Sequence, residues 1–396
     1  MGHPPRAGSP NQKKVNASMK ILLVNYEYKP QCGGAGLGIY NQAKAFKQKG
    51  HEVTILIGWD YAYGEPEIIE GVVTEIIPIK KKNVLQSSPI GLAKFVICGL
   101  GRINVLTRKE KFDIIQFYFS VPTGVLKYGI HGNVPYVVSL RGMDIPGLNK
   151  DHEKLSLLTK GLNSRIAANA AAVTALSQEA ARVYNAFSPN IDISVIPNAV
   201  DSNLYSQKTL YSKRITKFLS IARLTGFKRL PLLIRSISKV HEDYPSVTLD
   251  IYGEGPDRAD LEKLINELDA TNYINLMGFC EREVLYRRMA DYDVFSLLST
   301  GDSFGMVFVE AMSAGLPVLC ARAGGPVNIV QEGKTGIFAE PDDFDSAVSA
   351  IKYCIHNPDV MEEMGRNGRL LVENKYSIDG VANQHLGLYK KCIAMK

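Results

Sequence analysis

Short runs of β-branched and aromatic residues alternate with helical patterns along most of the chain, and this alternation limits the possible folds more than any other feature. The first two runs, KILLVNY at 20–26 and VTILIGW at 53–59, are separated by a helical pattern around residues 39–49. Further strands are predicted at 72–79, 112–119, 136–140 and 171–177, with a helix at 153–169. Strands that alternate with helices favour a parallel sheet covered by helices on both faces.

A polar stretch without clear periodicity, residues 197–217, interrupts the alternation, which then restarts. The later strands are predicted at 217–222, 247–253, 274–278, 293–299 and 316–321. We therefore expect an α/β fold of two Rossmann-like, doubly wound domains, with ligands bound in the central cleft at the carboxyl ends of the strands. The predicted segments are a disordered leader or tag (1–18), a first domain (19–200), a linker (201–216), a second domain (217–377) and a C-terminal helix (378–396) that packs back on the first domain.

Composition excludes several other classes of protein. Of the 396 residues, 45% are apolar and 22% are charged, which is typical of globular proteins and not of disordered or fibrous ones. No uninterrupted run of 18 apolar residues occurs, so no membrane-spanning segment is expected. The six cysteines are widely spaced and lack a zinc-binding pattern, which predicts reduced thiols and a cytoplasmic protein.

Charge is distributed unevenly between the two halves of the chain. Residues 1–200 contain 23 Lys and Arg against 14 Asp and Glu, a net charge of +9, whereas the remaining residues contain 23 against 26, a net charge of −3. A basic first half can meet an anionic partner, although scattered solvated lysines give the same sum. The overall charge of +6 is too small to indicate a nucleic-acid partner.

The densest group of candidate functional residues is STGDSFGMVFVEAMSAGLPVL at 299–319, where a strand is predicted to end and a helix to begin. Gly305 lets the backbone approach a ligand, and the free N–H groups of the first helical turn suit a phosphate. Asp302 before the helix and Glu310 within it can bind sugar hydroxyls on either side of that phosphate. An ordinary strand–helix turn, with Asp302 as a cap and Glu310 in solvent, explains the pattern equally well.

Two cations, Arg223 and Lys228, follow the predicted strand at 217–222 and precede a helix. They are therefore expected at the carboxyl edge of the second sheet, where they can neutralise the same diphosphate without a metal ion. The alternative is that both are ordinary surface residues.

A glycine-rich segment, CGGAGLGIYNQ at 32–42, opens the first predicted helix. Its glycines do not form G-x-G-x-x-G and begin about six residues after the strand, so the dinucleotide-binding fingerprint is absent. The loop at Gly33 and Gly34 can still bring backbone N–H groups to an anion across the cleft.

A second loop of the first domain, SLRGMDIPG at 139–147, carries Arg141 and Asp144 after a predicted strand. We expect both side chains at the carboxyl edge of the first sheet, facing the cleft, although a structural role is nearly as plausible. The D-Y-D sequence at 291–293 resembles a metal-binding motif, but the start of a buried strand explains it better, and no metal site is predicted.

Taken in order, these motifs resemble glycosyltransferase family 4, the retaining GT-B enzymes, over nearly all of residues 19–396. The resemblance rests on the glycine loop at 33–34, GHEVTI at 50–55, the RG-x-D loop at 141–144, PNAVD at 197–201, ARL…K at 222–228, YGEGP at 252–256, MGF at 277–279, FGMVFVEAMSAGLPV at 304–318, GG at 324–325 and EGKTGIF at 332–338. It implies transfer of a sugar from a UDP-, GDP- or ADP-sugar to a glycan or lipid-linked acceptor that binds the first domain.

The resemblance also implies roles for single residues. The family has two acidic residues eight positions apart, here Asp302, which would contact the donor sugar, and Glu310, which would bind the ribose. Arg223 and Lys228 match the pair that binds the diphosphate. The backbone N–H groups of Phe304, Gly305, Met306 and Val307 would hold sugar and diphosphate. Gly33, Gly34 and Ser303 are also expected to bind the donor. No cofactor or metal ion is implied.

This sequence departs from the family pattern at three places. Asp302 replaces a Glu, Arg141 stands where many members have His, and G-G-x-P-E becomes GGPVN at 324–328. A retaining transfer tolerates the missing His, because the departing phosphate oxygen can take the acceptor's proton while the protein stabilises the leaving diphosphate. The alternatives are a non-catalytic nucleotide-sugar or glycan-binding protein on the same fold, an oxidoreductase, and a metal-dependent transferase.

The basic first half also suggests where an acceptor could be found. Lys80, Lys81 and Lys82 precede PIGLAKFVICGLGRINVL at 89–106, which itself carries Lys94 and Arg102. This pattern would suit shallow docking on the anionic inner face of a membrane, or a lipid-diphosphate acceptor. A core-packing helix with a basic outer face is an equally good interpretation.

Overall fold

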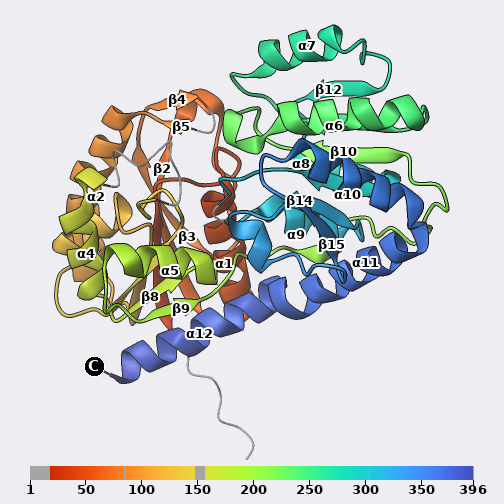
Figure 1. Ribbon diagram of the computed structural model, residues 1–396. Helices are drawn as coiled ribbons and strands as arrows, with labels where there is room; N and C mark the ends of the chain where they lie inside the picture. The colour runs from red at the N-terminus through yellow and green to blue at the C-terminus, as the bar shows by residue number, and fades with distance from the viewer. Residues whose placement is uncertain (1–17, 84–85, 148–156, 303, 396) are drawn as a thin grey trace, which may run out of the picture.

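The computed structural model describes residues 18–83, 86–147, 157–302 and 304–395. Within them the chain forms two α/β domains, each built on one parallel sheet, which lie side by side in Figure 1. The predicted fold class of two Rossmann-like domains is thus confirmed. The predicted leader lies outside the described residues except for Ser18.

The first domain is built on a seven-stranded sheet in the order β3-β2-β1-β6-β7-β8-β9. The strand order reverses between β1 (Lys20–Asn25) and β6 (Ile114–Tyr118), which pair in parallel. A crevice opens at such a switch point, so the loop that follows β1 lies at the binding edge of this sheet. The other strands are β2 (Glu52–Trp59), β3 (Val73–Pro78), β7 (Tyr136–Leu140), β8 (Ala172–Ala175) and β9 (Ile193–Val195).

Helices cover both faces of this sheet (Figure 1). α1 (Gly34–Gln48) packs on β1 and β2, whereas α2 (Pro89–Lys109) packs on β3 and on the short helix η2 (Thr123–Gly129). The hairpin that leads into α2 is formed by β4 (Lys81–Asn83) and β5 (Gln86–Ser87), and the remaining helices are η1 (Tyr61–Tyr63), α4 (Lys160–Ala168) and α5 (Gln178–Phe187).

α2 is the one helix in the described part of the chain that is long and apolar enough to cross a membrane, with a mean hydropathy of 1.5 over 18 residues. Its inner side chains, among them Phe95 and Ile103, are nevertheless buried in the core of the first domain. Gly99 lies so close to this core that a Cβ there would be 2.7 Å from Leu126. α2 is therefore an outer-layer helix of the domain, with one face left in solvent.

The second domain repeats the plan with six parallel strands in the order β12-β11-β10-β13-β14-β15. Its switch point lies between β10 (Lys217–Ile221) and β13 (Val294–Leu297). The other strands are β11 (Thr248–Tyr252), β12 (Ile274–Gly278), β14 (Val318–Ala321) and β15 (Gly336–Ala339), and the main helices are α6 (Leu230–Asp243), α7 (Arg258–Glu267), α8 (Arg282–Arg288), α9 (Met306–Ser313), α10 (Phe344–His356) and α11 (Pro358–Leu371). Of all the strands in the two sheets, only the short edge strands β9 and β15 were not predicted from the sequence.

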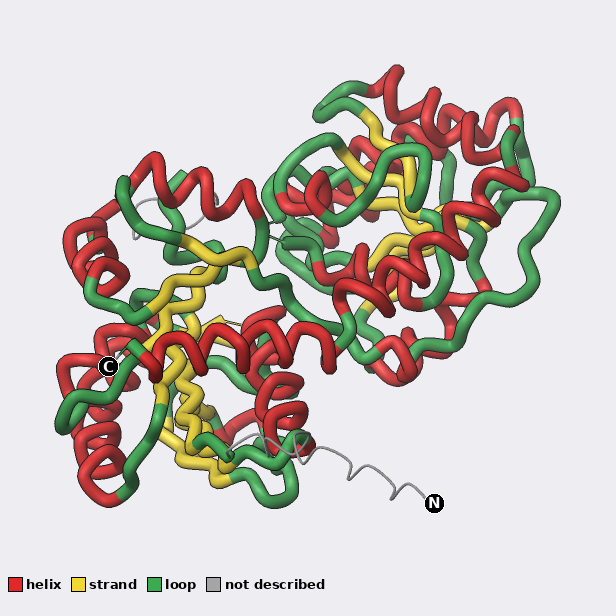
Figure 2. The backbone as a smooth tube through the Cα atoms, turned by 90° about the horizontal axis from the view of Figure 1, so that it is seen from below, coloured by secondary structure: helices red, strands yellow, loops and turns green. Residues whose placement is uncertain are grey.

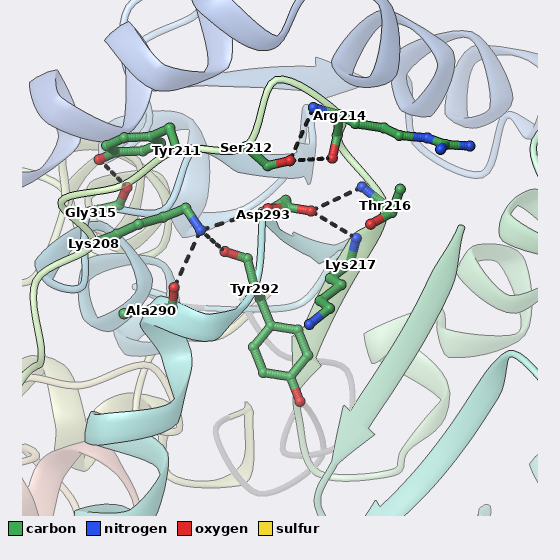
Figure 3. Close-up of polar contacts among 10 residues, drawn as sticks. All are labelled: Lys208, Tyr211, Ser212, Arg214, Thr216, Lys217, Ala290, Tyr292, Asp293 and Gly315. Carbon is green, nitrogen blue, oxygen red and sulfur yellow. Dashed lines mark hydrogen bonds and ion pairs between the residues drawn. The ribbon is translucent and has the colours of Figure 1, made fainter. Parts of the chain in front are cut away.

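A buried ion pair fixes the linker between the domains to the second sheet (Figure 3). Lys208 donates to the carbonyl oxygens of Ala290 at 3.2 Å and Tyr292 at 2.7 Å, and its Nζ lies 3.6 Å from Asp293. Asp293 in turn accepts from the backbone N–H groups of residues 216 and 217 at 2.9 and 3.0 Å. The second Asp of the D-Y-D motif therefore has a structural role at the amino end of the sheet, opposite the binding edge.

The chain crosses between the domains a second time, before its last helix, α12 (Ile378–Ala394). Val200 and Ser377 pair where the two crossings meet. α12 then runs along the first domain, as both Figure 1 and Figure 2 show. Its residues Ala382, Leu386, Tyr389 and Cys392 are buried in the core of that domain.

Candidate active site

Two loops meet at the switch point of the second sheet, one after β10 and one after β13. Lys228 of the first loop donates to both carboxylate oxygens of Asp302 in the second, at 2.7 and 2.9 Å. The two side chains are only 11% and 16% exposed. A largely desolvated cation and anion thus stand together at the binding edge.

Backbone contacts hold these two loops in register. The N–H of Thr300 donates to the carbonyl oxygen of Phe227 at 3.0 Å, and a Cβ at Gly301 would lie 3.1 Å from the Phe227 ring. Arg223, half-buried, lies in the same loop as Lys228. Gly253, directly after β11, packs against this loop. No side chain fits there, because the φ of Gly253 is +138° and a Cβ would lie 1.9 Å from the carbonyl oxygen of Ala222.

The loop after β13 ends at the start of α9. Gly305 precedes the helix with a φ of +91°, and a Cβ there would lie 2.6 Å from the Phe308 ring. The first N–H groups of α9, at Met306 and Val307, have no helical partner and are free for a ligand. Phe304 is buried with its ring centroid 6.0 Å from that of Tyr376, and Ser303 lies outside the described residues.

The Gly324–Gly325 pair supports the same loop from behind. The N–H of Gly325 donates to the carbonyl oxygen of Asp302 at 2.7 Å, and a Cβ at Gly325 would lie 2.6 Å from the Phe304 backbone. The two glycines therefore shape the loop that carries Asp302, whatever follows them in the chain.

Glu310 lies one turn into α9 and is 8% exposed. Its Oε1 accepts from Nη1 of Arg282 in α8 at 3.1 Å. Burial alone would lower the pKa of the Arg282 guanidinium, but Glu310 and Tyr286 raise it above its usual value. Sequence reasoning missed Arg282, because no spacing or motif distinguishes it from the other basic residues of α8.

The glycine loop of the first domain reaches this site across the cleft. A Cβ at Gly34 would lie 3.4 Å from Cγ of Met306 and 3.8 Å from Nδ2 of Asn198. Beside it, a Cβ at Gly33 would lie 3.8 Å from Oε2 of Glu27. Burial raises the pKa of the Glu27 carboxyl, against the opposing effects of Lys81, Tyr26 and the Gly33 N–H.

Arg141 and Asp144 are both buried, and their predicted place on the acceptor side of the cleft stays a prediction. Asp144 is 2% exposed and accepts from the backbone N–H groups of Ser120, Arg141 and Gly142. The Arg141 guanidinium lies 4.3 Å from the centroid of the Tyr118 ring and donates to Asn198. The loop turns inward because its carboxylate satisfies N–H groups that would otherwise be buried without partners.

The Arg141 side chain lines a small cavity where α12 meets the first domain. The cavity measures about 20 Å³, and His385 of α12 also lines it. Burial, together with the charge of Arg141, lowers the pKa of His385 to about 3. His385 is therefore neutral in the folded protein over the whole neutral and mildly acidic range.

This depressed pKa predicts an acid-dependent loss of stability. Below an unfolded-state pKa of about 6.5, the unfolded chain binds a proton at His385 that the folded chain excludes until about pH 3, so stability falls as pH falls through that window. Between pH 8 and pH 5 we expect the wild type to lose about 2 kcal/mol more than His385→Leu. Thermal unfolding at both pH values measures this difference. The exposed His131→Leu serves as control, and an equal pH dependence of wild type and His385→Leu would refute the prediction.

Two protein families account for nearly the whole of the described fold. Residues 32–204 match the model of "Glycosyltransferase Family 4", and residues 201–371 match "Glycosyl transferases group 1". The same residues form the two domains whose cleft brings the glycine loop against α9. Together, fold, site and matches define an enzyme that takes a sugar from a nucleotide sugar.

Relatives and solved structures agree with this class along the full length. An uncharacterized glycosyltransferase of Methanocaldococcus jannaschii is 27% identical, over 95% of this chain and 99% of its own. The N-acetyl-alpha-D-glucosaminyl L-malate synthase of Bacillus anthracis is 21% identical, over 94% and 96%. Among structures, sucrose-phosphate synthase from Thermosynechococcus elongatus shares the fold with a TM-score of 0.81 at 19% identity, over 96% of this chain and 100% of that one. The chain belongs to the group 1 glycosyltransferases, with a family 4 first domain, and has the GT-B fold.

Proposed function

We propose that this glycosyltransferase transfers its sugar with retention of anomeric configuration, without a metal ion, to a glycan or lipid-linked acceptor. The observation that carries the proposal is the pair Lys228 and Asp302, held at the switch point of the second sheet beside the start of α9. A cation, a carboxylate and the first N–H groups of a helix thus occur at the same switch point, which suits a sugar joined to a diphosphate.

The ion pair of the free protein changes partners when the donor binds. The negatively charged diphosphate replaces Asp302 as the partner of Lys228, and it also contacts Arg223 and the N-terminus of α9. The Asp302 carboxylate is then released to accept hydrogen bonds from hydroxyl groups of the donor sugar. Glu310 uses Oε1 for Arg282 and keeps Oε2 for the ribose hydroxyls.

Proton transfer needs no separate base in this scheme. The acceptor hydroxyl approaches the anomeric carbon on the face from which the diphosphate leaves. The bond from that carbon to the β-phosphate oxygen breaks, the new glycosidic bond forms, and the acceptor's proton passes to the departing phosphate oxygen. The protein contributes position and charge stabilisation through Arg223, Lys228 and the first N–H groups of α9.

The names of similar proteins suggest which donors and acceptors to test first. The Anabaena HepE structure, with a TM-score of 0.72, was solved with UDP and glucose. Relatives are named for products as different as a glucosaminyl L-malate and a glucosylated diacylglycerol. UDP-sugars are therefore the first donors to test, ahead of GDP- and ADP-sugars. We place the reaction in the cytoplasm, in peripheral contact with an anionic membrane.

A panel of UDP-, GDP- and ADP-sugars tests the proposed function in two measurements. A donor that binds the folded chain should raise its melting temperature in proportion to its affinity. The same donor should be slowly hydrolysed without acceptor, at equal rates with and without EDTA. Binding without any turnover would favour the non-catalytic alternative, and loss of turnover with EDTA would overturn metal independence.

Glu310→Gln is expected to weaken nucleotide binding about ten- to a hundredfold. The amide still accepts from Arg282, but the charged acceptor for the ribose hydroxyls is lost, and hydrogen bonds to charged groups contribute about 1.5–3 kcal/mol. Titration calorimetry with UDP, or with the nucleotide that stabilises the protein most, measures the affinity. The exposed Glu340→Gln is the matched control, and equal affinities in the two variants would remove Glu310 from the ribose site.

A further inference from the structure

The outer face of α2 combines apolar and basic side chains that nothing in the described chain covers. Ile90 is 80% exposed, Ile97 71% and Val105 43%, although each occupies a helix of an ordered domain. Lys94 and Arg108 are exposed on the same helical stripe, because residues three, four and seven positions apart share one face. We call these five residues, together with the exposed Lys80 and Lys82, the α2 face.

The charge of the α2 face has one sign. The 21 residues of α2, PIGLAKFVICGLGRINVLTRK, include four Lys and Arg and no acidic residue. An adjoining groove of about 280 Å³ runs between this helix and edge strand β3, lined by Ile76, Pro78 and Val105 among others. Exposed apolar side chains flanked by cations are complementary to a surface with anionic groups outside and hydrocarbon beneath them, such as a bilayer with anionic headgroups.

The α2 face is continuous with the cleft. Ser88 caps the start of α2 and also donates to the carbonyl oxygen of Lys80 at 2.8 Å, and a Cβ at Gly91 would lie 2.2 Å from that oxygen. Lys81 in turn donates its ammonium group to the carbonyl oxygen of Gln31, in the loop that leads to Gly33 and Gly34. The basic segment 80–82 therefore joins the start of α2 to the acceptor side of the active site.

An aromatic turn lies against the same segment. The Asp60 carboxylate accepts from the N–H of Lys81 at 2.8 Å and of Ala62 at 3.1 Å, which fixes η1 next to residues 80–82. η1 exposes Tyr61 and Tyr63, 48% and 38%. Tyrosines prefer a place where one end of the ring is apolar and the other is wet, as at the boundary of a lipid bilayer.

We propose that the α2 face is a docking site for an anionic lipid bilayer, and that the acceptor reaches the cleft from that surface. This assignment of the acceptor rests on the proposed transfer function, whereas the docking itself does not. α2 lies in the plane of the interface and does not cross it, because Phe95, Ile103 and Leu106 hold its inner face in the domain core. In Figure 1 α2 flanks the first domain on the side away from the second domain, so docking leaves the second domain free to bind its donor.

Flotation of the full chain with vesicles tests the docking. The neutral vesicles contain phosphatidylcholine alone, and the anionic vesicles contain phosphatidylcholine with about 30% phosphatidylglycerol, which gives them a negative surface potential. The wild type should float with the anionic vesicles only, and raising NaCl from about 0.1 to 0.5 M should release most of it, since screening shortens the reach of the lysines. Ile90→Glu/Ile97→Glu and Lys94→Gln/Arg108→Gln should each reduce the bound fraction at least tenfold.

Leu370→Glu is the matched control, because Leu370 is also helical and 55% exposed but lies on α11 of the second domain. It should float like the wild type. Donor hydrolysis without vesicles should be the same in all these variants. Hydrolysis therefore tests the proposed transfer function, and flotation tests the docking independently of it. Equal flotation of Ile90→Glu/Ile97→Glu and wild type, or no flotation of either, overturns the proposal. So does a wild-type dimer that the same variant converts to monomers, because the face would then bind a second copy of the chain.

Discussion

Lys228→Ala is expected to lower the turnover number by about a hundredfold or more, comparable to the loss of one donor that stabilises a developing anion. The leaving diphosphate gains negative charge in the transition state, and Lys228 is the cation held 2.7 Å from Asp302 at that point. Arg223→Ala should cause a loss of similar size, because its loop places it at the same edge. Steady-state kinetics with the donor selected by the nucleotide-sugar panel measures both variants.

The kinetic signature separates this role from simple binding. Removing a residue that acts in the transition state lowers kcat together with kcat/KM. Removing a contact that is equally strong in the ground state and the transition state raises KM alone. Lys239→Ala is the control, since Lys239 is an exposed lysine in the neighbouring helix α6 and pairs with the exposed Glu242. Near-normal turnover in both Lys228→Ala and Arg223→Ala would overturn the assignment of the diphosphate site.

Asp293→Ala is expected to destabilise the second domain by about 3–5 kcal/mol, the usual cost of leaving one partner of a buried ion pair alone. Lys208 and Asp293 are each 7% exposed, and the variant also removes the acceptor of the two N–H groups at 216 and 217. Burial lowers the pKa of Lys208 despite the attraction of Asp293, which shows that desolvation dominates at this site. Calorimetric melting of the full chain should show the second-domain transition lowered by roughly 10 °C.

An exposed ion pair in the same linker provides the control. Lys213 lies 2.5 Å from Asp359, but the two side chains are 71% and 80% exposed. Lys213→Met should change stability by less than about 1 kcal/mol, as exposed ion pairs do. Lys208→Met should cost as much as Asp293→Ala, and the double variant should cost less than the two together, because both remove the same interaction. Additive losses would mean that the two side chains act independently.

The central strands of both sheets were predictable because they are buried on both faces and therefore read as continuous apolar runs. β9 and β15 escaped prediction because they are edge strands of three and four residues, too short for a pattern to emerge. The linker was recognised by its polarity, but its anchor at Asp293 depends on a lysine 85 positions away in the chain, which no local pattern reveals.

The part of the site that follows buried strands could also be predicted from the sequence. Lys228, Asp302 and Glu310 follow buried strands, and parallel strands bring the loops at their carboxyl ends together. The same argument placed Arg141 and Asp144 at the cleft, but it could not show that both are buried. An Asp four positions after the strand accepts from local backbone N–H groups, which no motif reveals. Arg282 could not be found, since its importance comes from a partner 28 positions away in another helix.

The return of α12 to the first domain has a consequence for the order in which the protein is made. Ala382, Leu386, Tyr389 and Cys392 belong to a core whose other fully buried members precede residue 190, so this core includes residues that are made after the whole second domain. The second domain, contained between β10 and α11, can close beforehand. During synthesis the first domain therefore exposes the apolar residues that α12 covers until α12 has been made, and a truncation at residue 377 exposes them permanently.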